Sequence, residues 1–149
     1  MTGVMATSKG QVADDRTVSD DDLHLGIDVL DTEHRQLLAI MNRLRTACRD
    51  GADPQAIDGI ASDLVASVRN HIGSEEAQMA SWHYDGIDRH KAAHERLLNT
   101  LETILRPIRH QPGHDIADDV FGFLLTWLDE HILSEDKLFA DFLKGHGVE

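Results

Sequence analysis

Histidines and carboxylates recur in this sequence at the spacing of successive helix turns. Three segments combine a histidine with a second potential metal ligand four or five residues later: His71 with Glu75, His90 with His94, and His131 with Glu135 or Asp136. Residues four apart lie on the same face of an α-helix, one turn from each other. Each segment therefore offers two imidazole or carboxylate groups to a metal ion, and a lone histidine, His34, precedes them.

Four amphipathic helices are expected to position these side chains, because apolar residues recur at intervals of three and four in four segments. The expected helices run from near Asp28 or Asp31 to Gly51, from Pro54 to Trp82, from near Asp88 to about Pro107, and from near Asp115 to Lys144. Asp28 and Asp31 are both suitable N-caps for the first helix, and Pro54 suits a first helical turn. Pro107 is expected to end the third helix, because proline has no N–H group to donate.

Each helix has an apolar stripe that is expected to face the core, and the candidate ligands lie within these stripes. The four stripes are Leu30, His34, Leu37, Met41, Leu44 and Cys48; Ile57, Ile60, Leu64, Val68, His71, Glu75, Met79 and Trp82; Ile87, His90, His94, Leu97, Leu101 and Ile104; and Val120, Leu124, Trp127, Leu128, His131, Ile132, Leu138 and Phe142. Short loops between the helices predict an all-α fold, an up-down-up-down antiparallel four-helix bundle over residues 23–144. We expect a flexible N-terminal extension at residues 1–22 and a short tail at residues 145–149.

Helix geometry places the candidate ligands at one level of this bundle. In each hairpin, ligands on the two helices lie at nearly equal distances along the chain from the turn: His34 and His71 from Ala52, Glu75 and His94 from Asp85, and His94 and His131 from Pro112. Burying so many polar groups without partners would cost several kcal/mol, which a bound metal ion would offset. The sequence therefore predicts a metal site in the bundle core.

The carboxylate that accompanies His131 is left open by spacing alone. Glu135 follows His131 by four residues, which suits an ideal helix. Asp136 follows by five residues and would lie roughly 140° away on an ideal helix. A local widening of the helix, such as a π-bulge, would turn Asp136 inward instead.

Composition narrows the class of protein further. The net charge of −13 argues against binding to nucleic acid or to anionic membranes. No run approaches the ~20 apolar residues that span a bilayer, and the N-terminal segment lacks the apolar core of a signal peptide. We therefore expect a cytoplasmic protein. Cys48 is the only cysteine, so no internal disulfide can form, and its place on an apolar stripe predicts a small core residue.

The combined motifs resemble the hemerythrin family, and most of all its single-domain bacterial members (bacteriohemerythrins). The matching segments are Gly26 to His34, His71 to Glu76 with Met79, His90 to His94, and Trp127 to Ile132 with Asp136. The family pattern at the fourth segment favours Asp136 over Glu135. Two positions depart from the family: Ile72 stands where phenylalanine is frequent, and no tryptophan occurs between Ser19 and His24.

The resemblance implies two iron ions (Fe2+/Fe3+) with a bridging oxo or hydroxo group. His90, His94 and His131 would bind one iron, His34 and His71 the other, while Glu75 and Asp136 bridge them. This ligand set leaves one open position, on the iron with two histidines, where O2 would bind. Apolar neighbours are expected to wall this site against water: Leu37, Ile72, Leu128 and Ile132.

These features predict reversible O2 binding in a carrier, storage or delivery protein rather than an enzyme. The alternatives are an O2 or redox sensor, or a di-iron oxidase or an enzyme that consumes peroxide or nitric oxide; iron storage ranks last. Expected partners are O2 and a protein that accepts O2 or supplies electrons, without nucleic acid or membrane insertion. The other histidines are expected to bind no metal: His24, His83, His110, His114 and His146. Four further acids are expected to be solvated or to bond the ligands: Glu33, Glu76, Asp129 and Glu130.

Overall fold

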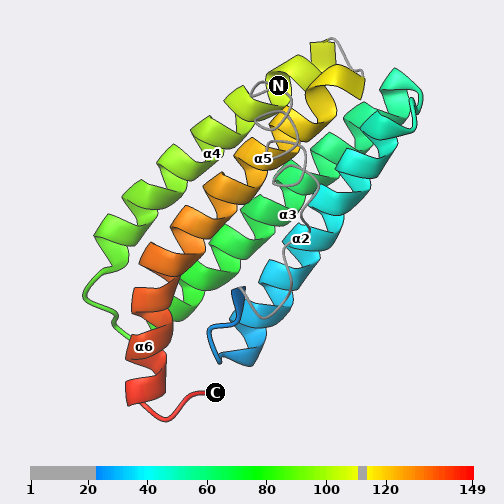
Figure 1. Cartoon of the computed structure of the whole chain (residues 1–149). Coiled ribbons are helices and arrows are strands. Elements are labelled where there is room, and N and C mark those ends of the chain that lie inside the picture. The colour runs from blue at the N-terminus through cyan, green and yellow to red at the C-terminus, as the bar shows by residue number, and fades with distance from the viewer. Residues whose placement is uncertain (1–22, 111–113) are drawn as a thin grey trace, which may run out of the picture.

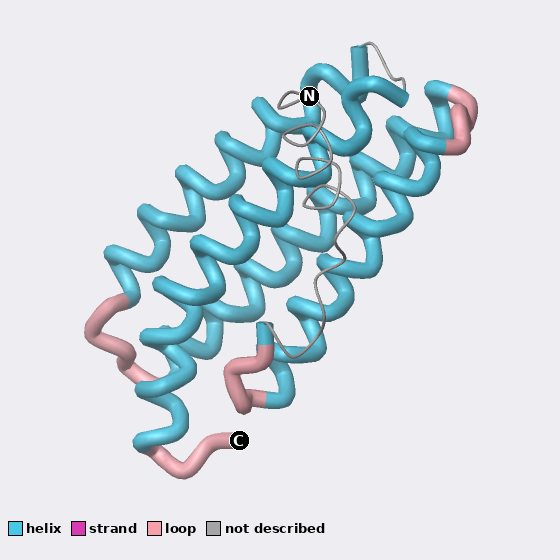
Figure 2. Tube along the Cα trace, viewed as in Figure 1, coloured by secondary structure: helices cyan, strands magenta, loops and turns pink. Residues whose placement is uncertain are grey.

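A computed structural model describes residues 23–110 and 114–149 of the chain. Its elements are α2 (Asp28–Arg49), α3 (Pro54–Ser81), α4 (Ile87–His110), α5 (His114–His131), η2 (Ile132–Asp136) and α6 (Lys137–Gly145). Within those residues the chain is helices joined by short loops, with no strand (Figure 1, Figure 2). The segment η2 is one turn of π-helix, and it joins α5 and α6 into a single rod.

The helices form an antiparallel bundle of four rods, as the sequence predicts. Helix α2 packs against α3 and α5, and α4 packs against the same two neighbours. Each rod runs opposite to the one before it, so the topology is up-down-up-down (Figure 1). The expected tail at residues 1–22 lies outside the described part of the chain. No described helix is long and apolar enough to cross a membrane.

The first helix begins at Asp28, as predicted, but neither aspartate caps it. Its N-cap residue is Ile27, and no side chain caps the helix there. Asp31 instead lies inside the helix and accepts hydrogen bonds from the backbone N–H groups of Leu25 (2.8 Å) and Gly26 (3.0 Å). The carboxylate thus holds the preceding segment against the helix. The positive φ of Gly26, 85°, allows the tight bend that this contact requires.

Three helices, α2, α3 and α6, end in the same backbone arrangement. In each, an N–H group bonds to the carbonyl five residues earlier: Ala52 to Ala47, Tyr84 to Met79 and Val148 to Leu143. This is the Schellman arrangement, which places one residue in the left-handed conformation. Glycine takes that position after α2 and α6, at Gly51 and Gly147, whereas His83 takes it after α3 with φ 54°.

The third helix continues past the proline that was expected to end it. Helix α4 reaches His110 with Pro107 inside it, so the predicted end is wrong. Leu105 and Ile108 lie on both sides of Pro107 and are buried in the core. Burial of these side chains offsets the hydrogen bond that proline removes.

The predicted stripe of the fourth helix fails after His131. Leu138 was expected in the core but is 45% exposed, and Phe142 is only partly buried. Phe139 and Leu143, one position further along, are fully buried instead. The π-turn η2 inserts one residue into the helical repeat, which shifts the buried face by one position.

The other predicted stripes agree with the structure except near their edges. Ile60, Ile87 and Ile104 are partly buried rather than central, and Trp82 is 39% exposed beyond the end of α3. Cys48 is fully buried among apolar side chains, as expected, and burial raises the pKa of its thiol. The core therefore holds the candidate ligands among mainly apolar side chains.

Candidate metal centre

Seven buried histidine and carboxylate side chains meet at one level of the bundle. They come from every rod: His34 from α2, His71 and Glu75 from α3, His90 and His94 from α4, His131 from α5, and Asp136 from η2. Each is at most 7% exposed. They are the seven residues that the sequence and the resemblance single out as ligands.

Their potential ligand atoms form two overlapping groups. One group comprises Glu75, His90, His94, His131 and Asp136. The other comprises His34, His71, Glu75 and Asp136. Within each group the ligand atoms lie no more than 4.8 Å from one another. The two carboxylates are therefore the members that both groups share.

The Nε2 atoms of the histidines point at these shared carboxylates. On one side, His34 Nε2 lies 2.9 Å from Asp136 Oδ2. On the other, His90 Nε2 lies 2.7 Å from Glu75 Oε1 and 3.0 Å from Asp136 Oδ1. His94 Nε2 lies 3.0 Å from Glu75 Oε1. Imidazole nitrogens on both sides of two carboxylates resemble the donor set of a dinuclear metal site.

The π-turn decides which acid of the fourth rod joins the cluster. Asp136 is fully buried, and its Oδ1 lies 2.9 Å from His131 Nε2. Glu135 points outward and accepts hydrogen bonds from Arg89 on α4 at 3.1 and 3.2 Å. The Ser134 hydroxyl donates to the Glu130 carbonyl where the helix widens. The structure thus brings Asp136, and not Glu135, to the histidines.

Two further carboxylates hold the outer nitrogens of histidines in the cluster. His71 Nδ1 donates to Glu33 Oε1, and His94 Nδ1 donates to Glu76 Oε2, both at 2.8 Å. Such bonds fix the tautomer and orientation of an imidazole, so that Nε2 is free to bind a metal. Of the two readings left open for these acids, solvation and bonding to the ligands, the structure shows the second.

The buried histidines and carboxylates of the cluster shift one another's pKa values. Burial opposes the charged form of His71, but nearby Asp136, the bond to Glu33 and the charge of Glu75 outweigh it and raise its pKa to about 10. Burial likewise opposes charge on His90, and Asp136 and Glu75 raise its pKa to about 9. Burial also works against the Asp136 carboxylate, yet the charge and hydrogen bonds of the histidines lower its pKa well below the ordinary value.

These residues fit a pair of metal cations. Several buried polar atoms that face the cluster make no hydrogen bond of acceptable geometry: His71 Nε2, Glu75 Oε2, and His131 Nε2 despite its distance of 2.9 Å from Asp136 Oδ1. Buried polar atoms without partners are costly, and metal coordination is one way to satisfy them. A cation would also take the place of the histidine protons that balance the charge of the two carboxylates.

The four apolar residues expected near the site are all buried. Leu37, Leu128 and Ile132 are at most 2% exposed, and Ile72 is 9% exposed. All four belong to the main apolar core. They lie one turn or less along the chain from His34, His71 or His131.

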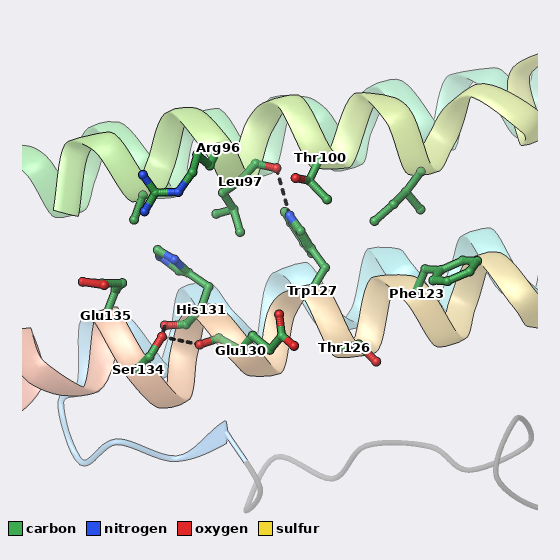
Figure 3. A pocket seen from close by; sticks show the side chains of 12 residues that line it. Arg96, Leu97, Thr100, Phe123, Thr126, Trp127, Glu130, His131, Ser134 and Glu135 are labelled. Atoms are coloured by element: carbon green, nitrogen blue, oxygen red, sulfur yellow. Dashed lines mark hydrogen bonds between the residues drawn. The ribbon is translucent and has the colours of Figure 1, made fainter. Parts of the chain in front are cut away.

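A surface groove beside the cluster was not foreseen from the sequence. It lies between α4 and α5, has a volume of about 590 Å³, and is lined by Arg96, Leu97, Phe123, Trp127, Glu130 and His131 among others (Figure 3). Trp127 closes part of it by donating from its indole nitrogen to the Leu97 carbonyl at 2.9 Å. The sequence did contain one sign of this groove: Phe123, a large apolar residue outside the predicted stripe of the fourth helix, eight residues before His131. In the structure it is 62% exposed.

Three of the remaining histidines lie away from the cluster. His24 contacts Asp31 at 3.1 Å, His83 forms the left-handed end of α3, and His146 bonds to the Phe142 carbonyl. The side chains of His110 and His114 lie outside the described part of the chain.

Fold and site together define a class: a four-helix bundle whose core holds two overlapping groups of histidines and shared carboxylates that could bind metal ions. Residues 25–143 match the family model described as the hemerythrin HHE cation binding domain. This chain belongs to the hemerythrin family.

Known relatives support this assignment over most of the chain. The chain is 32% identical over 126 residues to a bacteriohemerythrin of Stenotrophomonas maltophilia, which covers 85% of this chain and 80% of the relative. It is 29% identical to a bacteriohemerythrin of Clostridium acetobutylicum, covering 81% and 96%. It is 26% identical to a myohemerythrin of Theromyzon tessulatum, covering 72% and 77%.

Proposed function

We propose that this protein binds O2 reversibly at a di-iron centre and serves as a carrier, store or delivery protein for O2. The observation that carries the proposal is the division of seven buried ligands into two overlapping groups that share Glu75 and Asp136. Membership of the hemerythrin family implies a non-haem di-iron site that binds oxygen. The donor set supports such a site, since imidazoles and carboxylates suit iron.

In this proposal His90, His94 and His131 hold one iron, and His34 and His71 hold the other. Glu75 and Asp136 belong to both groups, and each offers two carboxylate oxygens, so both residues would help to hold both irons. The group with only two histidines supplies fewer protein ligands, so its iron would be the one to bind O2. When bound there, iron supplies a site for a diatomic ligand and alternates between its ferrous and ferric states.

The protein's own side chains determine what happens around that position. Glu33 and Glu76 hold His71 and His94 so that Nε2 points inward. Leu37, Ile72, Leu128 and Ile132 form an apolar wall that keeps water away from bound O2. If water and protons are excluded from the site, O2 can leave unchanged and the protein returns to its reduced form, ready to bind again.

The ligand set favours binding over oxygenation chemistry. Ferritin-like di-iron carboxylate proteins use four carboxylates and two histidines. Here the proportions are reversed, with five histidines and two carboxylates in the two groups. Neutral imidazoles stabilise high oxidation states of iron less well than anionic oxygen donors do. We therefore propose a carrier rather than an enzyme.

Absorption spectroscopy of the iron-loaded protein tests the proposal. The reduced protein is exposed to O2 without a reductant, and the gas is then removed by purging with argon. We expect a visible band that appears with O2, disappears on purging, and returns over repeated cycles. Irreversible oxidation with no oxygenated form, or steady consumption of O2 with an added reductant, would exclude the carrier role.

A further inference from the structure

Aromatic rings connect the cluster to the α3–α4 turn. The ring of Phe139, on α6, lies 6.4 Å from that of His90 between centroids. Tyr84, in the turn, lies 5.0 Å from Phe139. Phe139 is fully buried, so this inner part of the path is dry. The only tyrosine of the sequence thus lies two ring contacts from a candidate iron ligand.

The same series of rings continues to the surface. Tyr84 lies 4.9 Å from Phe142, and Phe142 lies 4.4 Å from His146. His146 lies 5.7 Å from Trp82, which is 39% exposed. We refer to these six residues as the aromatic row: His90, Phe139, Tyr84, Phe142, His146 and Trp82.

The backbone brings the two oxidisable members of the row together. Trp82 and Tyr84 flank His83 in the Schellman turn, where the Tyr84 N–H bonds to the Met79 carbonyl at 2.9 Å. Two residues of chain keep their Cα atoms within about 7 Å of each other. This turn lies beside α6 (Figure 1), which supplies Phe139 between Tyr84 and the cluster and Phe142 between Tyr84 and His146.

We propose that Tyr84 and Trp82 donate electrons to the metal centre when hydrogen peroxide reacts with its oxidised form. The proposal rests on the di-iron centre proposed above and adds a protective reaction to it. Electron tunnelling weakens steeply with distance, so closely spaced rings favour this path over others. Phenylalanine and imidazole are much harder to oxidise than phenol or indole. Electrons therefore pass through the intervening rings without oxidising them, and the radicals form on Tyr84 and Trp82.

The reaction balances without any other oxidant. Reduction of hydrogen peroxide to two molecules of water breaks the O–O bond and consumes two electrons and two protons. When iron is already ferric, Tyr84 supplies one electron and its phenolic proton, and Trp82 supplies one electron and its indole proton. The products are a neutral tyrosyl and a neutral tryptophanyl radical. Two external thiols then return one electron and one proton each and are oxidised to a disulfide; the electrons enter at Trp82, which is accessible at the surface.

The surroundings of Tyr84 agree with this proton-coupled step. Burial and the negative charge of Glu135 raise the pKa of Tyr84, so the phenol stays protonated at neutral pH. Loss of an electron makes the phenol strongly acidic, and partial exposure lets its proton reach solvent. Oxidising equivalents thereby leave the histidine ligands, which would otherwise be damaged.

Radical trapping on the full iron-loaded chain tests the proposal. The ferric protein is mixed with hydrogen peroxide and frozen for electron paramagnetic resonance, and a parallel sample is digested to map oxidised residues by mass spectrometry. We expect a tyrosyl signal, oxidation of Trp82, and little oxidation of Trp127. Tyr84→Phe, which keeps the ring contacts, should abolish the signal, lower Trp82 oxidation and increase oxidation of the ligand histidines per bound iron.

Further variants make each outcome decisive. Trp82→Phe should retain the tyrosyl signal but lengthen its lifetime in the presence of a thiol, because the surface residue through which thiol electrons reach Tyr84 is missing. Phe123→Leu, in the groove on another face of α5, should match the wild-type protein. A signal that persists in Tyr84→Phe, or equal Trp82 oxidation in iron-free protein, would overturn the proposal. An unchanged radical lifetime in Trp82→Phe would remove Trp82 from it.

The two proposals fail separately. Reversible O2 binding is measured on the same wild-type preparation. If that binding is absent while the Tyr84 radical forms, the carrier function is wrong and the aromatic row stands. If O2 binds reversibly but peroxide produces no radical on Tyr84, only the row is wrong.

Discussion

Helix α3 and the rod α5–η2–α6 each bring one histidine and one carboxylate to the cluster, by different backbone geometry. In α3, His71 and Glu75 are four residues apart on a regular helix. In the fourth rod, His131 and Asp136 are five residues apart, and the π-turn η2 between them absorbs the extra residue. Both carboxylates end fully buried and shared by the two ligand groups. The comparison shows that equivalent positions in space need not have equivalent spacing in sequence.

The difference has a cost and a consequence. A π-turn is a rare and less stable form of helix that occurs mostly at functional sites. Here it shifts the whole buried face of α6, so that Phe139 and Leu143 enter the core in place of Leu138 and Phe142. Regular helix α3 has no such freedom, because its buried face continues unbroken through Met79. The following changes test this contrast, from the largest expected effect to the smallest.

Inserting one alanine between Gly73 and Ser74 should abolish the site. The insertion rotates Glu75 and Met79 by about 100° away from the core. We expect loss of bound iron and of at least about 3 kcal/mol in the free energy of unfolding, through lost core packing. Iron analysis and thermal unfolding measure both effects. An alanine inserted into the α2–α3 loop is the control, and equal iron content in the two variants would contradict the contrast.

Replacing Asp136 by asparagine should remove iron while leaving the fold intact. The substitution keeps the shape of the side chain but removes the charge that both ligand groups share. We expect iron content to fall by at least roughly tenfold, because loss of a residue that merely orients a ligand already costs about that much. Glu135→Gln is the matched control, because Glu135 bonds to Arg89 at the surface. Iron loss in Glu135→Gln with retention in Asp136→Asn would show that the π-turn is misplaced.

The iron-free protein should lose stability as the pH rises from about 6.5 to about 10. The pKa values of His71 and His90 are raised to about 10 and about 9, so protonation stabilises the folded state. That contribution is complete below the unfolded value near 6.5 and is lost as the pH rises through the folded values. The low pKa of Asp136 acts oppositely, at acidic pH.

Metal binding should remove this pH dependence, since cations replace those protons. Thermal unfolding of iron-free and iron-loaded samples from pH 6 to pH 10 measures the difference. Parallel curves for the two samples would show that the cluster does not exchange protons for metal.

Deleting Leu133 should have the smallest effect. Leu133 is 54% exposed within η2, and its removal converts the π-turn into ordinary helix. Asp136 would then follow His131 by one regular turn, as Glu75 follows His71, while α6 keeps its buried face. We expect a change of at most about 1 kcal/mol in the free energy of unfolding and unchanged iron content. A matched deletion of Gly73 from α3 should abolish iron binding, and equal behaviour of both deletions would refute the comparison.

Much of the architecture could be predicted because it depends on local periodicity. Apolar spacing predicted four helices, and equal distances from the turns predicted one level for His34, His71, His94 and His131. The end of α4 could not be predicted in this way. Pro107 is a local signal to stop, whereas burial of Ile108 is a tertiary effect that outweighs it.

The surroundings of the site were less predictable than its members. Glu33 and Glu76 lie next to ligands in the sequence, but only the packing of α2 on α3 and of α3 on α4 brings their carboxylates to His71 and His94. The aromatic row depends on contacts between the α3–α4 turn and α6, which no spacing within one helix encodes. Such contacts join residues that are far apart in the sequence.

By itself, the sequence determined the helical class, the order of the helices and the identity of the histidines in the core, because helical periodicity places each residue relative to its own helix axis. Helical periodicity alone did not decide between Glu135 and Asp136; the family resemblance favoured Asp136, and only the tertiary structure shows how that residue reaches the core. An added residue can be absorbed by a π-turn wherever core packing and ligand contacts outweigh the cost of the wider helix. That balance includes the burial of Phe139 and Leu143 as well as the charges around Asp136. It is a property of the assembled bundle, and no single helix contains it.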